Sequence, residues 1–327
     1  MVDSEITIVI LTFNSIDHIE SCIQSVLNQD YLSVNLSIVD NASSDGTVDL
    51  IRRLYPEIPI KVLLCNLGFS KAHNLMISET SSEFYMPLNP DVRLTPAYLS
   101  ELFRVMETQD LAGSVVGKIM FMKDNGEITN RIYSTGHLLT RSRSPTNRGY
   151  KKTDTYKYER LELIFAANGA APLYRREMLE DISLDGEYFC EDFFVYGEDH
   201  DLGWRAQLRG WKCIYNPKAL AYHVGFGSGG INDFRVQIQF SRNRYLTLVR
   251  NDDLFFFIAD LPFIIVYEFV LLFYWLFRSP RRILAHWIGI IQAFSSFIRT
   301  YHTRESIQER RKVRRSYIRS FFVSQLW

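Results

Sequence analysis

An acid held beside a proline ends one of the most apolar stretches of the sequence. In YMPLNPDVRLTP the apolar run 84–88 predicts a strand, which Asn89, Pro90 and Asp91 then interrupt. A carboxylate at the end of a buried strand suits a hard divalent cation, because such ions prefer oxygen ligands. Pro90 stiffens the turn, and Asn89 is placed to contact a sugar or a diphosphate. The alternative is an ordinary Asn-Pro-Asp turn without a ligand.

A second acidic group lies far downstream, in the stretch FFVYGEDHDLGWRAQLRGWKCIYNPKALAYHVG. Glu198 and Asp199 are adjacent, and acids so close repel one another, which raises one pKa and can prepare a general base. Asp201 and Arg205 stand four residues apart on a predicted helix, so we expect them to form an ion pair. His223 ends a strand-like run and could bind the same cation as Asp91; the alternative is a plain polar histidine.

Two earlier loops are rich in polar residues. VDNASSDGT places Asp40 at the end of a strand, where a carboxylate can accept a hydrogen bond from a nucleobase while its polar neighbours hold ribose. The alternative is that Asp40 and Asp45 only cap the turn and the helix that follows. In NLGFSKAHN, Gly68 permits close backbone approach at a predicted helix amino terminus, which favours phosphate.

These loops follow strands that alternate with helices. Apolar runs predict strands at 6–11, 36–39, 60–64 and 84–88, and helical spacing predicts helices at 16–27, 47–54 and 70–77. This alternation implies right-handed βαβ units in a doubly wound, mostly parallel sheet. Ligands of such sheets bind at the carboxyl ends of the strands, so we expect the loops 12–15, 40–47, 66–74 and 89–91 to form one site.

Charge and cysteine usage limit the class of protein. The 327 residues have no formal net charge, yet 278–327 contain eleven Lys and Arg residues and only two acids. We therefore expect an anionic membrane surface as a partner and no nucleic acid; a solvated basic helix is the alternative. Four cysteines without CxxC spacing indicate neither a zinc site nor disulfides. No signal peptide is recognisable, and the chain is expected on the cytoplasmic side.

The sequence also predicts the behaviour of two further segments. The polar, basic stretch 140–158 is expected to be a mobile loop that can close over an anionic ligand. The apolar stretch 254–277 is long enough to span a bilayer. However, it contains Asp260, Pro262 and Glu268, and an acid at mid-membrane costs ~2.5–3.5 kcal/mol. We predict helices that lie in the membrane interface with Trp275 and Trp287 near the headgroups. A spanning helix, or a buried helix of a possible homo-oligomer, is the alternative.

Six motifs together resemble inverting family 2 glycosyltransferases of the GT-A fold, in the branch of bacterial rhamnosyltransferases and galactofuranosyltransferases. They are VILTFN, VDNASSDGT, NLGFSKAHN, LNPDV, AANGAAPLYRREM and YGEDHDLGWRAQLRGWKCIYNPKALAYH, and they cover roughly residues 5–250. The resemblance implies an α/β GT-A catalytic domain at 1–240, a Rossmann-like, mostly parallel sheet with flanking helices. The remaining residues, 241–327, would be a helical membrane-association region. The sequence departs from the family at Cys190, where the family often has an aspartate; we take that aspartate as structural.

The resemblance also implies roles for individual residues. Asp199 matches the catalytic base and Glu198 assists acceptor binding or tunes the base, while Asp91 and His223 match the ligands of Mg²⁺ or Mn²⁺. Asn89 stands where the first acid of the family's Asp-X-Asp motif is usual. The expected contacts to the nucleotide-sugar are made by Thr12, Asn14, Asp40, Asn41, Asn66, Gly68, Asn74, Asn89, Asn168 and Gly169.

The reaction that this resemblance implies is transfer of a hexose with inversion of the anomeric centre. The expected donor is dTDP-rhamnose, with UDP-sugars open. The expected acceptor is a polyprenyl-diphosphate-linked saccharide of cell-envelope polysaccharide assembly, such as O-antigen. Arg242 and Arg244 could hold the acceptor diphosphate by bidentate bonds. The alternatives are a membrane-bound scaffold that binds nucleotide-sugars without turnover and a nucleotidyltransferase with a similar amino-terminal half.

Overall fold

The amino-terminal part of the chain alternates strands and helices as predicted. The computed structural model describes residues 5–225 and 233–324. The first elements are β1 (Ile6–Thr12), α1 (Ile19–Leu27), β2 (Val34–Asp40), α2 (Thr47–Leu54), β3 (Ile60–Val62), α3 (Gly68–Glu79) and β4 (Phe84–Leu88). Helix α1 begins three residues later than expected, because the backbone N–H groups of His18 and Ile19 both donate to the Ser15 carbonyl and form a turn first.

A second group of elements extends the same sheet. It comprises β5 (Val92–Leu94), α4 (Tyr98–Thr108), β6 (Ala112–Met122), β7 (Ile128–Ser134), β10 (Glu162–Ile164), β11 (Leu173–Arg175), α5 (Arg176–Ile182), α6 (Glu198–Arg209) and β12 (Lys212–His223). The strand order is β10-β12-β6-β11-β4-β1-β2-β3, with β5 paired to β12 and β7 to β6. Strands β1 to β4 pair in parallel, as do β6 and β12, whereas β11 runs antiparallel between β4 and β6.

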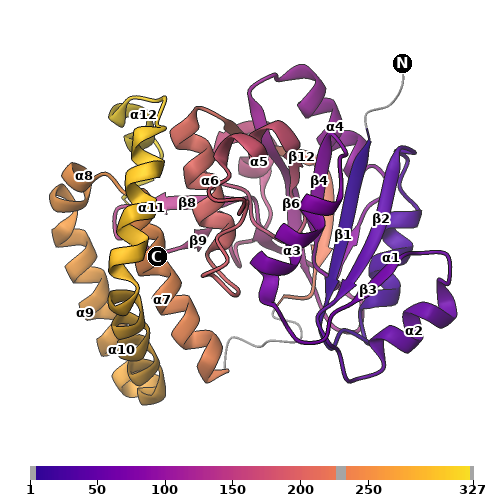
Figure 1. Cartoon of the computed structure of the whole chain (residues 1–327), viewed down its shortest axis with the longest axis horizontal. Coiled ribbons are helices and arrows are strands. Elements are labelled where there is room, and N and C mark those ends of the chain that lie inside the picture. The colour runs from indigo at the N-terminus through magenta and orange to yellow at the C-terminus, as the bar shows by residue number, and fades with distance from the viewer. Residues whose placement is uncertain (1–4, 226–232, 325–327) are drawn as a thin grey trace.

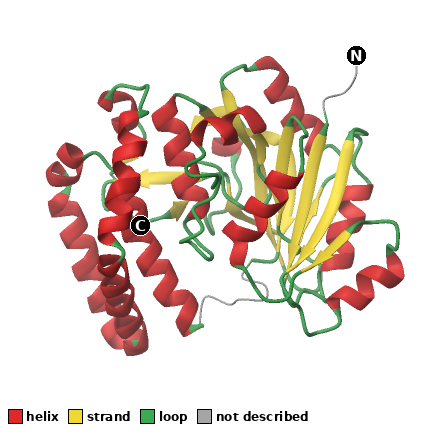
Figure 2. Cartoon of the chain, viewed as in Figure 1, coloured by secondary structure: helices red, strands yellow, loops and turns green. Residues whose placement is uncertain are grey.

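Helices cover both faces of this sheet (Figures 1 and 2). Alternate residues of β1 point to opposite sides: Ile8 and Ile10 pack in the core beneath α1 and α4, whereas Val9 packs beneath α3, α5 and α6. Both faces of β1 are buried, which accounts for its largely apolar sequence, ITIVILT. The predicted GT-A-like α/β fold with a mostly parallel sheet is confirmed.

The mobility expected of segment 140–158 stays a prediction, but the segment contains regular structure and buried side chains that its polarity did not indicate. It joins β8 (His137–Thr140) to β9 (Thr146–Asn147) and includes a short 3-10 helix, Tyr156–Tyr158. Arg143 within it is buried and pairs with Asp252 at 2.9 Å and with Asp260. Arg143 therefore forms ion pairs with acids of the carboxyl-terminal region. The polarity of the local sequence could not predict these distant partners.

The carboxyl-terminal region is helical and lies to one side of the sheet (Figure 1). Its elements are α7 (Phe234–Asn251), α8 (Leu254–Ala259), α9 (Leu261–Arg278), α10 (Pro280–Ser295), α11 (Phe297–Glu309), α12 (Arg315–Arg319) and β13 (Phe322–Val323). Strand β13 pairs with β8 in a small sheet of order β13-β8-β9. The domain boundary expected at residue 240 falls inside α7.

The apolar stretch 254–277 forms two helices that meet at Asp260. This carboxylate is fully buried and pairs with Arg141, Arg143 and Arg319. Glu268, two turns further, pairs with Arg244 and lies 3.1 Å from His286. Both acids therefore face protein cations, and the opposite side of α9 is apolar and exposed. By length and composition α9 could cross a membrane, since its mean hydropathy is 1.7 and only 6% of it is buried.

Candidate active site

The first two strand ends form one hydrogen-bonded unit. Thr12 ends β1 and Asp40 ends β2, and the Thr12 hydroxyl donates to Asp40 Oδ2 at 2.8 Å. The Ser43 backbone N–H donates to Asp40 Oδ1 at 2.8 Å, so this carboxylate also closes its own loop. The backbone N–H of Asn14, which has φ +49, donates to Ser43 Oγ, and Asn14 Oδ1 accepts from the Ser44 N–H. The predicted nucleotide loops therefore do meet at the carboxyl edge of the sheet.

The third loop is tied to the second. The Asn41 amide donates to the Gly68 carbonyl and accepts from the Leu67 N–H, while Asn66 Oδ1 accepts from the Gly68 N–H at 2.8 Å. The space over Gly68 is taken by protein, because an added Cβ would lie 2.4 Å from the Phe194 carbonyl oxygen. Gly68, at φ +77, is thus needed for the approach of Phe194.

Asn74 lies one and a half turns into α3, and its amide is engaged by backbone. It donates to the Phe189 carbonyl at 2.7 Å and accepts from the Phe189 N–H at 2.8 Å. The side chain thereby ties α3 to the segment before α6. Its predicted contact to the nucleotide-sugar stays a prediction, and the geometry shows a structural role.

Asp91 and His223 are brought together by the pairing of two strands. Val92 of β5 stands opposite His223 of β12, which places Asp91 Oδ1 3.0 Å from His223 Nε2. Both side chains are buried. Burial alone would raise the pKa of Asp91, but the neighbouring His223 outweighs it and the pKa is lowered. Asp91 is therefore held as a carboxylate.

This pair has the chemistry of a divalent cation site. Neither ring nitrogen of His223 has a hydrogen-bond partner of proper direction, although Nε2 faces the carboxylate. A carboxylate and an imidazole are both suitable ligands for Mn²⁺, and Mg²⁺ typically uses one or two carboxylates together with substrate phosphates. In residues 5–225 and 233–324 no group of three or more His, Cys, Asp or Glu side chains is arranged to hold a metal ion. The protein would thus supply two ligands, and a bound diphosphate would supply the rest.

The adjacent acids Glu198 and Asp199 open helix α6. Gly197, at φ +93, turns the chain into this helix, where Asp199 lies in the first turn. Asp199 Oδ2 lies 2.8 Å from His137 Nε2 and accepts from the Gly169 N–H at 2.9 Å. An added Cβ on Gly169 would lie only 3.3 Å from this oxygen. Gly169, predicted to line the sugar, thus holds the predicted base directly.

Burial and charge separate the two acids. Burial would raise the pKa of Asp199, but the His137 ion pair and the hydrogen bonds to the carboxylate lower it to about 2. Burial, and then the charge of Asp199, raise the pKa of Glu198 well above its ordinary value. Burial and the neighbouring carboxylate thus favour the neutral form of Glu198, whereas Asp199 is held as a carboxylate. Close acids were expected to raise one pKa, and that acid is Glu198, while His137 keeps the other ionised.

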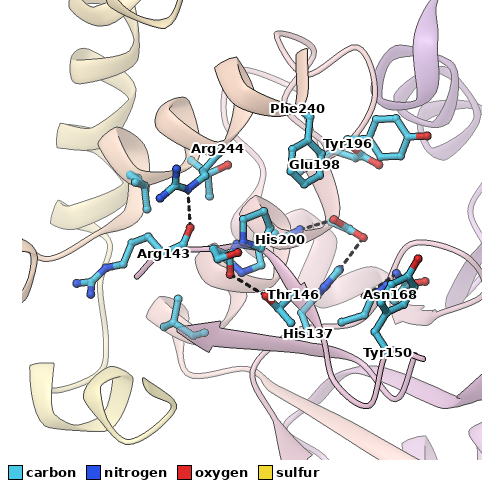
Figure 3. A pocket seen from close by; sticks show the side chains of 18 of the residues that line it. His137, Arg143, Thr146, Tyr150, Asn168, Tyr196, Glu198, His200, Phe240 and Arg244 are labelled. Carbon is cyan, nitrogen blue, oxygen red and sulfur yellow. Dashed lines mark hydrogen bonds and ion pairs between the residues drawn. The ribbon is translucent and has the colours of Figure 1, made fainter. Parts of the chain in front are cut away.

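Asp199 opens into a cavity of about 720 Å³ (Figure 3). Asn168 and Tyr133 line the same cavity, and Asn168 is joined to Asn147 by a hydrogen bond of 3.1 Å. The Tyr133 ring packs against His223 with centroids 4.2 Å apart. Burial raises the pKa of Tyr133, and the Asp91 and Asp199 carboxylates both raise it further. Tyr133 thus stands between the candidate cation ligands and the candidate base.

The two predicted diphosphate arginines differ in position. Arg244 lines the cavity; it donates to the carbonyls of Arg143 and Ser142 and pairs with Glu268. A guanidinium has five N–H groups, so these bonds leave it capacity for a ligand. Arg242 does not line the cavity, and it donates to the Asp192 carbonyl at 2.7 Å. Their role with an acceptor stays a prediction.

Other residues of the site escaped prediction. His137 has no motif around it, and its contact with Asp199 joins positions 62 apart in the sequence. The ion pair of Asp201 and Arg205 is confirmed at 2.9 Å. However, Asp201 also accepts from Arg250 at 2.8 Å and from Asn251 at 2.7 Å, both on α7. The acid after the Glu-Asp pair thus anchors α6 to the helical region.

Comparisons with known proteins place this geometry in context. The family model described as "Glycosyl transferase family 2" matches residues 7–183. N-acetylglucosaminyl-diphospho-decaprenol L-rhamnosyltransferase of Mycobacterium tuberculosis is 25% identical over 237 residues, which cover 66% of this chain and 75% of that protein. Succinoglycan biosynthesis protein ExoO of Rhizobium meliloti is 26% identical over 241 residues, 68% of this chain and 62% of that protein.

Solved structures show the same fold at low sequence identity. GalNAc-T7, in a crystal structure with UDP, GalNAc and Mn²⁺, superposes with a TM-score of 0.64 and 12% identity, over 81% of this chain and 50% of that chain. Residues 1–349 of S. aureus TarS superpose with a TM-score of 0.56 and 15% identity, over 95% and 93% of the two chains. At these identities the likeness concerns the fold alone.

Proposed function

The chain belongs to glycosyl transferase family 2, and from that premise we propose that it transfers a hexose from a nucleotide-sugar to a lipid-linked saccharide, with inversion and with a divalent cation. The observation that carries the proposal is the state of Asp199. This carboxylate is kept ionised by His137 and Gly169, and it faces a cavity that extends to the apolar helix α9. An ionised carboxylate beside a space for an acceptor is what a general base needs.

The proposed chemistry is a single displacement. The acceptor hydroxyl gives its proton to Asp199 while its oxygen attacks the anomeric carbon. The bond from that carbon to the diphosphate oxygen breaks on the opposite face, so the configuration inverts. General-base help of this kind is worth roughly 10²–10⁴-fold in rate. The raised pKa of Glu198 favours its protonated form, which can donate a hydrogen bond to the acceptor without competing for its proton.

Asp91 and His223 would hold the divalent cation, Mg²⁺ or Mn²⁺. When bound, it supplies positive charge to the leaving nucleoside diphosphate. The loops that carry Thr12, Asp40 and Asn41 lie at the same edge of the sheet and would bind the nucleoside. The Asp40 carboxylate already accepts from Thr12 and Ser43, so in this proposal it orders the loop as well as facing the base.

The proposed donor is dTDP-rhamnose. Its support is the similarity to an L-rhamnosyltransferase that acts on N-acetylglucosaminyl-diphospho-decaprenol, together with the LNPDV motif. A UDP-sugar is the second candidate, because the GalNAc-T7 structure with the same fold contains UDP. The acceptor in this proposal is a polyprenyl-diphosphate-linked saccharide used in cell-envelope polysaccharide synthesis.

Attachment to the cytoplasmic face of the membrane fits the helical region. Exposed apolar side chains lie along α9, α10 and α11, among them Phe269, Trp287 and Ile298. The basic residues of the tail contribute less than their number suggests. Arg311 and Arg315 pair with Asp253, and other basic residues also have internal partners, including Arg319 with Asp260. We propose an interfacial mode of binding dominated by apolar contact, with residues 1–240 catalytic and α7 continuous across the boundary.

The test is a donor panel with purified full-length protein, Mn²⁺ and N-acetylglucosaminyl-diphospho-polyprenol. We expect release of nucleoside diphosphate that depends on the acceptor, and a loss of about 10²–10⁴-fold in Asp199→Asn. Asp185→Asn, an exposed acid in the loop after α5, is the matched control and should keep full activity. Unchanged turnover in Asp199→Asn would refute the base, and release of pyrophosphate would favour a nucleotidyltransferase. No product with any donor would favour a silent scaffold.

A further inference from the structure

The cavity at Asp199 continues away from the carboxylates to the junction of α7 and α9. Val236 and Phe240 of α7 and Val270, Leu271 and Tyr274 of α9 form an apolar wall of it, and Phe240 also lies 6.3 Å from the Tyr196 ring. All five side chains are largely hydrocarbon, whereas other lining residues, among them Asp199, Asn168 and His137, supply carboxylate, amide and imidazole groups. The aliphatic part of this wall, Val236, Val270 and Leu271, suits a hydrocarbon chain better than a sugar or a nucleotide.

The wall reaches the protein surface at the membrane-facing side of α9. Val270 and Phe240 line the cavity and are each 40% exposed, so they stand at its mouth. Their neighbours Phe269 and Phe273 on α9 are 73% and 67% exposed. Apolar surface is therefore continuous from the cavity to the face that we propose contacts the bilayer.

Between the two ends lies Arg244. It contacts α9 through Glu268 and through the Tyr267 ring, 4.8 Å from its guanidinium carbon, and it is on the same face of α7 as Thr247. An added Cβ at Gly197, just before the catalytic pair, would lie 3.9 Å from Thr247 Oγ1. The cavity thus leads from carboxylates, past a guanidinium, to aliphatic side chains.

We infer that the acceptor extends along the whole cavity, and that its isoprenoid chain lies between α7 and α9 against Phe240, Val270 and Leu271. The order of groups in the cavity matches the order along such an acceptor: a saccharide hydroxyl, a diphosphate and a hydrocarbon chain. The inference takes the identity of the acceptor from the proposed function. What it adds is the place where the isoprenoid chain of the acceptor binds.

The direct test is photo-labelling of the full-length protein in nanodiscs with a diazirine-bearing farnesyl diphosphate, without donor. Labels should fall on peptides of α7 and α9, and unlabelled farnesyl diphosphate should displace them while phosphatidylglycerol does not. Labels elsewhere would overturn the inference. Equal displacement by phosphatidylglycerol would also overturn it, since the cavity would then hold a bilayer lipid.

A matched pair of variants tests the position of the chain. Leu271→Trp fills the wall, whereas Leu276→Trp makes the same change on the outer face of α9, where Leu276 is 55% exposed. We expect Leu271→Trp to weaken displacement by farnesyl diphosphate about tenfold, the equivalent of roughly two buried methylene groups. Leu276→Trp should change nothing, and equal effects of the two would count against the assigned wall.

The two proposals fail differently. Specific labelling of α7 and α9 without any transfer to lipid-linked acceptors would refute the proposed function and support the proposed binding place of the isoprenoid chain. Transfer of a sugar to such acceptors, with labels outside the cavity, would support the proposed function and refute the proposed binding place of the isoprenoid chain. Because the labelling uses the unaltered protein, a variant that fails to fold does not leave the inference undecided.

Discussion

Replacement of His137 should change the pH dependence of the reaction. In the structure His137 Nε2 lies 2.8 Å from Asp199 Oδ2, and the same oxygen accepts from the Gly169 N–H. His137→Leu removes both the charge and the hydrogen bond, whereas His137→Gln keeps an N–H donor without the charge. The pair of variants therefore separates the two contributions.

The direction of the change follows from the environment of Asp199. The base acts as a carboxylate, which predominates at any pH above its pKa, and that pKa is lowered from 3.8 to about 2. Once His137 is gone, burial raises the pKa, so the carboxylate is lost at a higher pH than before. The return to an ordinary value alone corresponds to roughly 2 kcal/mol of lost stabilisation of the charge.

The assay is kcat/KM for acceptor-dependent release of nucleoside diphosphate, from acid to mildly alkaline pH. We expect the acid limb to move to higher pH in His137→Leu and less so in His137→Gln. Activity should recover at alkaline pH, where Asp199 is ionised again. A uniform loss at every pH, with the thermal unfolding midpoint intact, would refute the electrostatic role and leave His137 as a structural residue only.

Four other changes probe the cation, the base, the core and the membrane face. His223→Gln should lower cation-dependent turnover by about 10²-fold and raise the Mn²⁺ concentration needed for half-maximal activity. Both are measured by adding Mn²⁺ back to protein from which a chelator has removed metal. Gly169→Ala places a methyl 3.3 Å from the Asp199 carboxylate, so kcat should fall about tenfold with little change in the thermal midpoint. The pKa of Asp201 is lowered from 3.8 to about 2. Its contribution to the free energy of unfolding, roughly 2 kcal/mol, is therefore present above pH ~4 and lost towards pH ~2. Asp201→Asn should make the free energy of unfolding, measured with urea, depend less on pH in this range. Phe273→Glu should reduce co-flotation with liposomes even in high salt, whereas a loss of binding by salt alone would indicate a purely electrostatic attachment.

The predictable part of the site is the part built from strand ends. Parallel strands bring their carboxyl ends to one edge whatever the helices do, so Thr12, Asp40 and Asp91 could be assigned to that edge from hydrophobic periodicity alone. His223 lies beside Asp91 because β12 pairs with β5; the family resemblance implied His223 as the second cation ligand, but the strand pairing was not predicted. The roles of Gly68 and Asn74 were harder to predict, because the protein's own backbone at Phe194 and Phe189 takes the space and the hydrogen bonds that a ligand was expected to use.

The least predictable feature links the middle of the chain to its carboxyl-terminal region. His137 opens β8, and this strand is paired on one side with β9 and on the other with β13, where Phe322 stands opposite Leu139. The Arg141 N–H also donates to the Val323 carbonyl at 3.1 Å. A strand of two residues near the carboxyl terminus gives no periodic signal, so neither its existence nor its partner can be found from sequence pattern. Yet it supports the strand that delivers His137 to Asp199. The carboxyl-terminal region therefore supports the proposed base as well as carrying the proposed membrane face, and the pairing of β8 with β13 is one of the contacts that join the two.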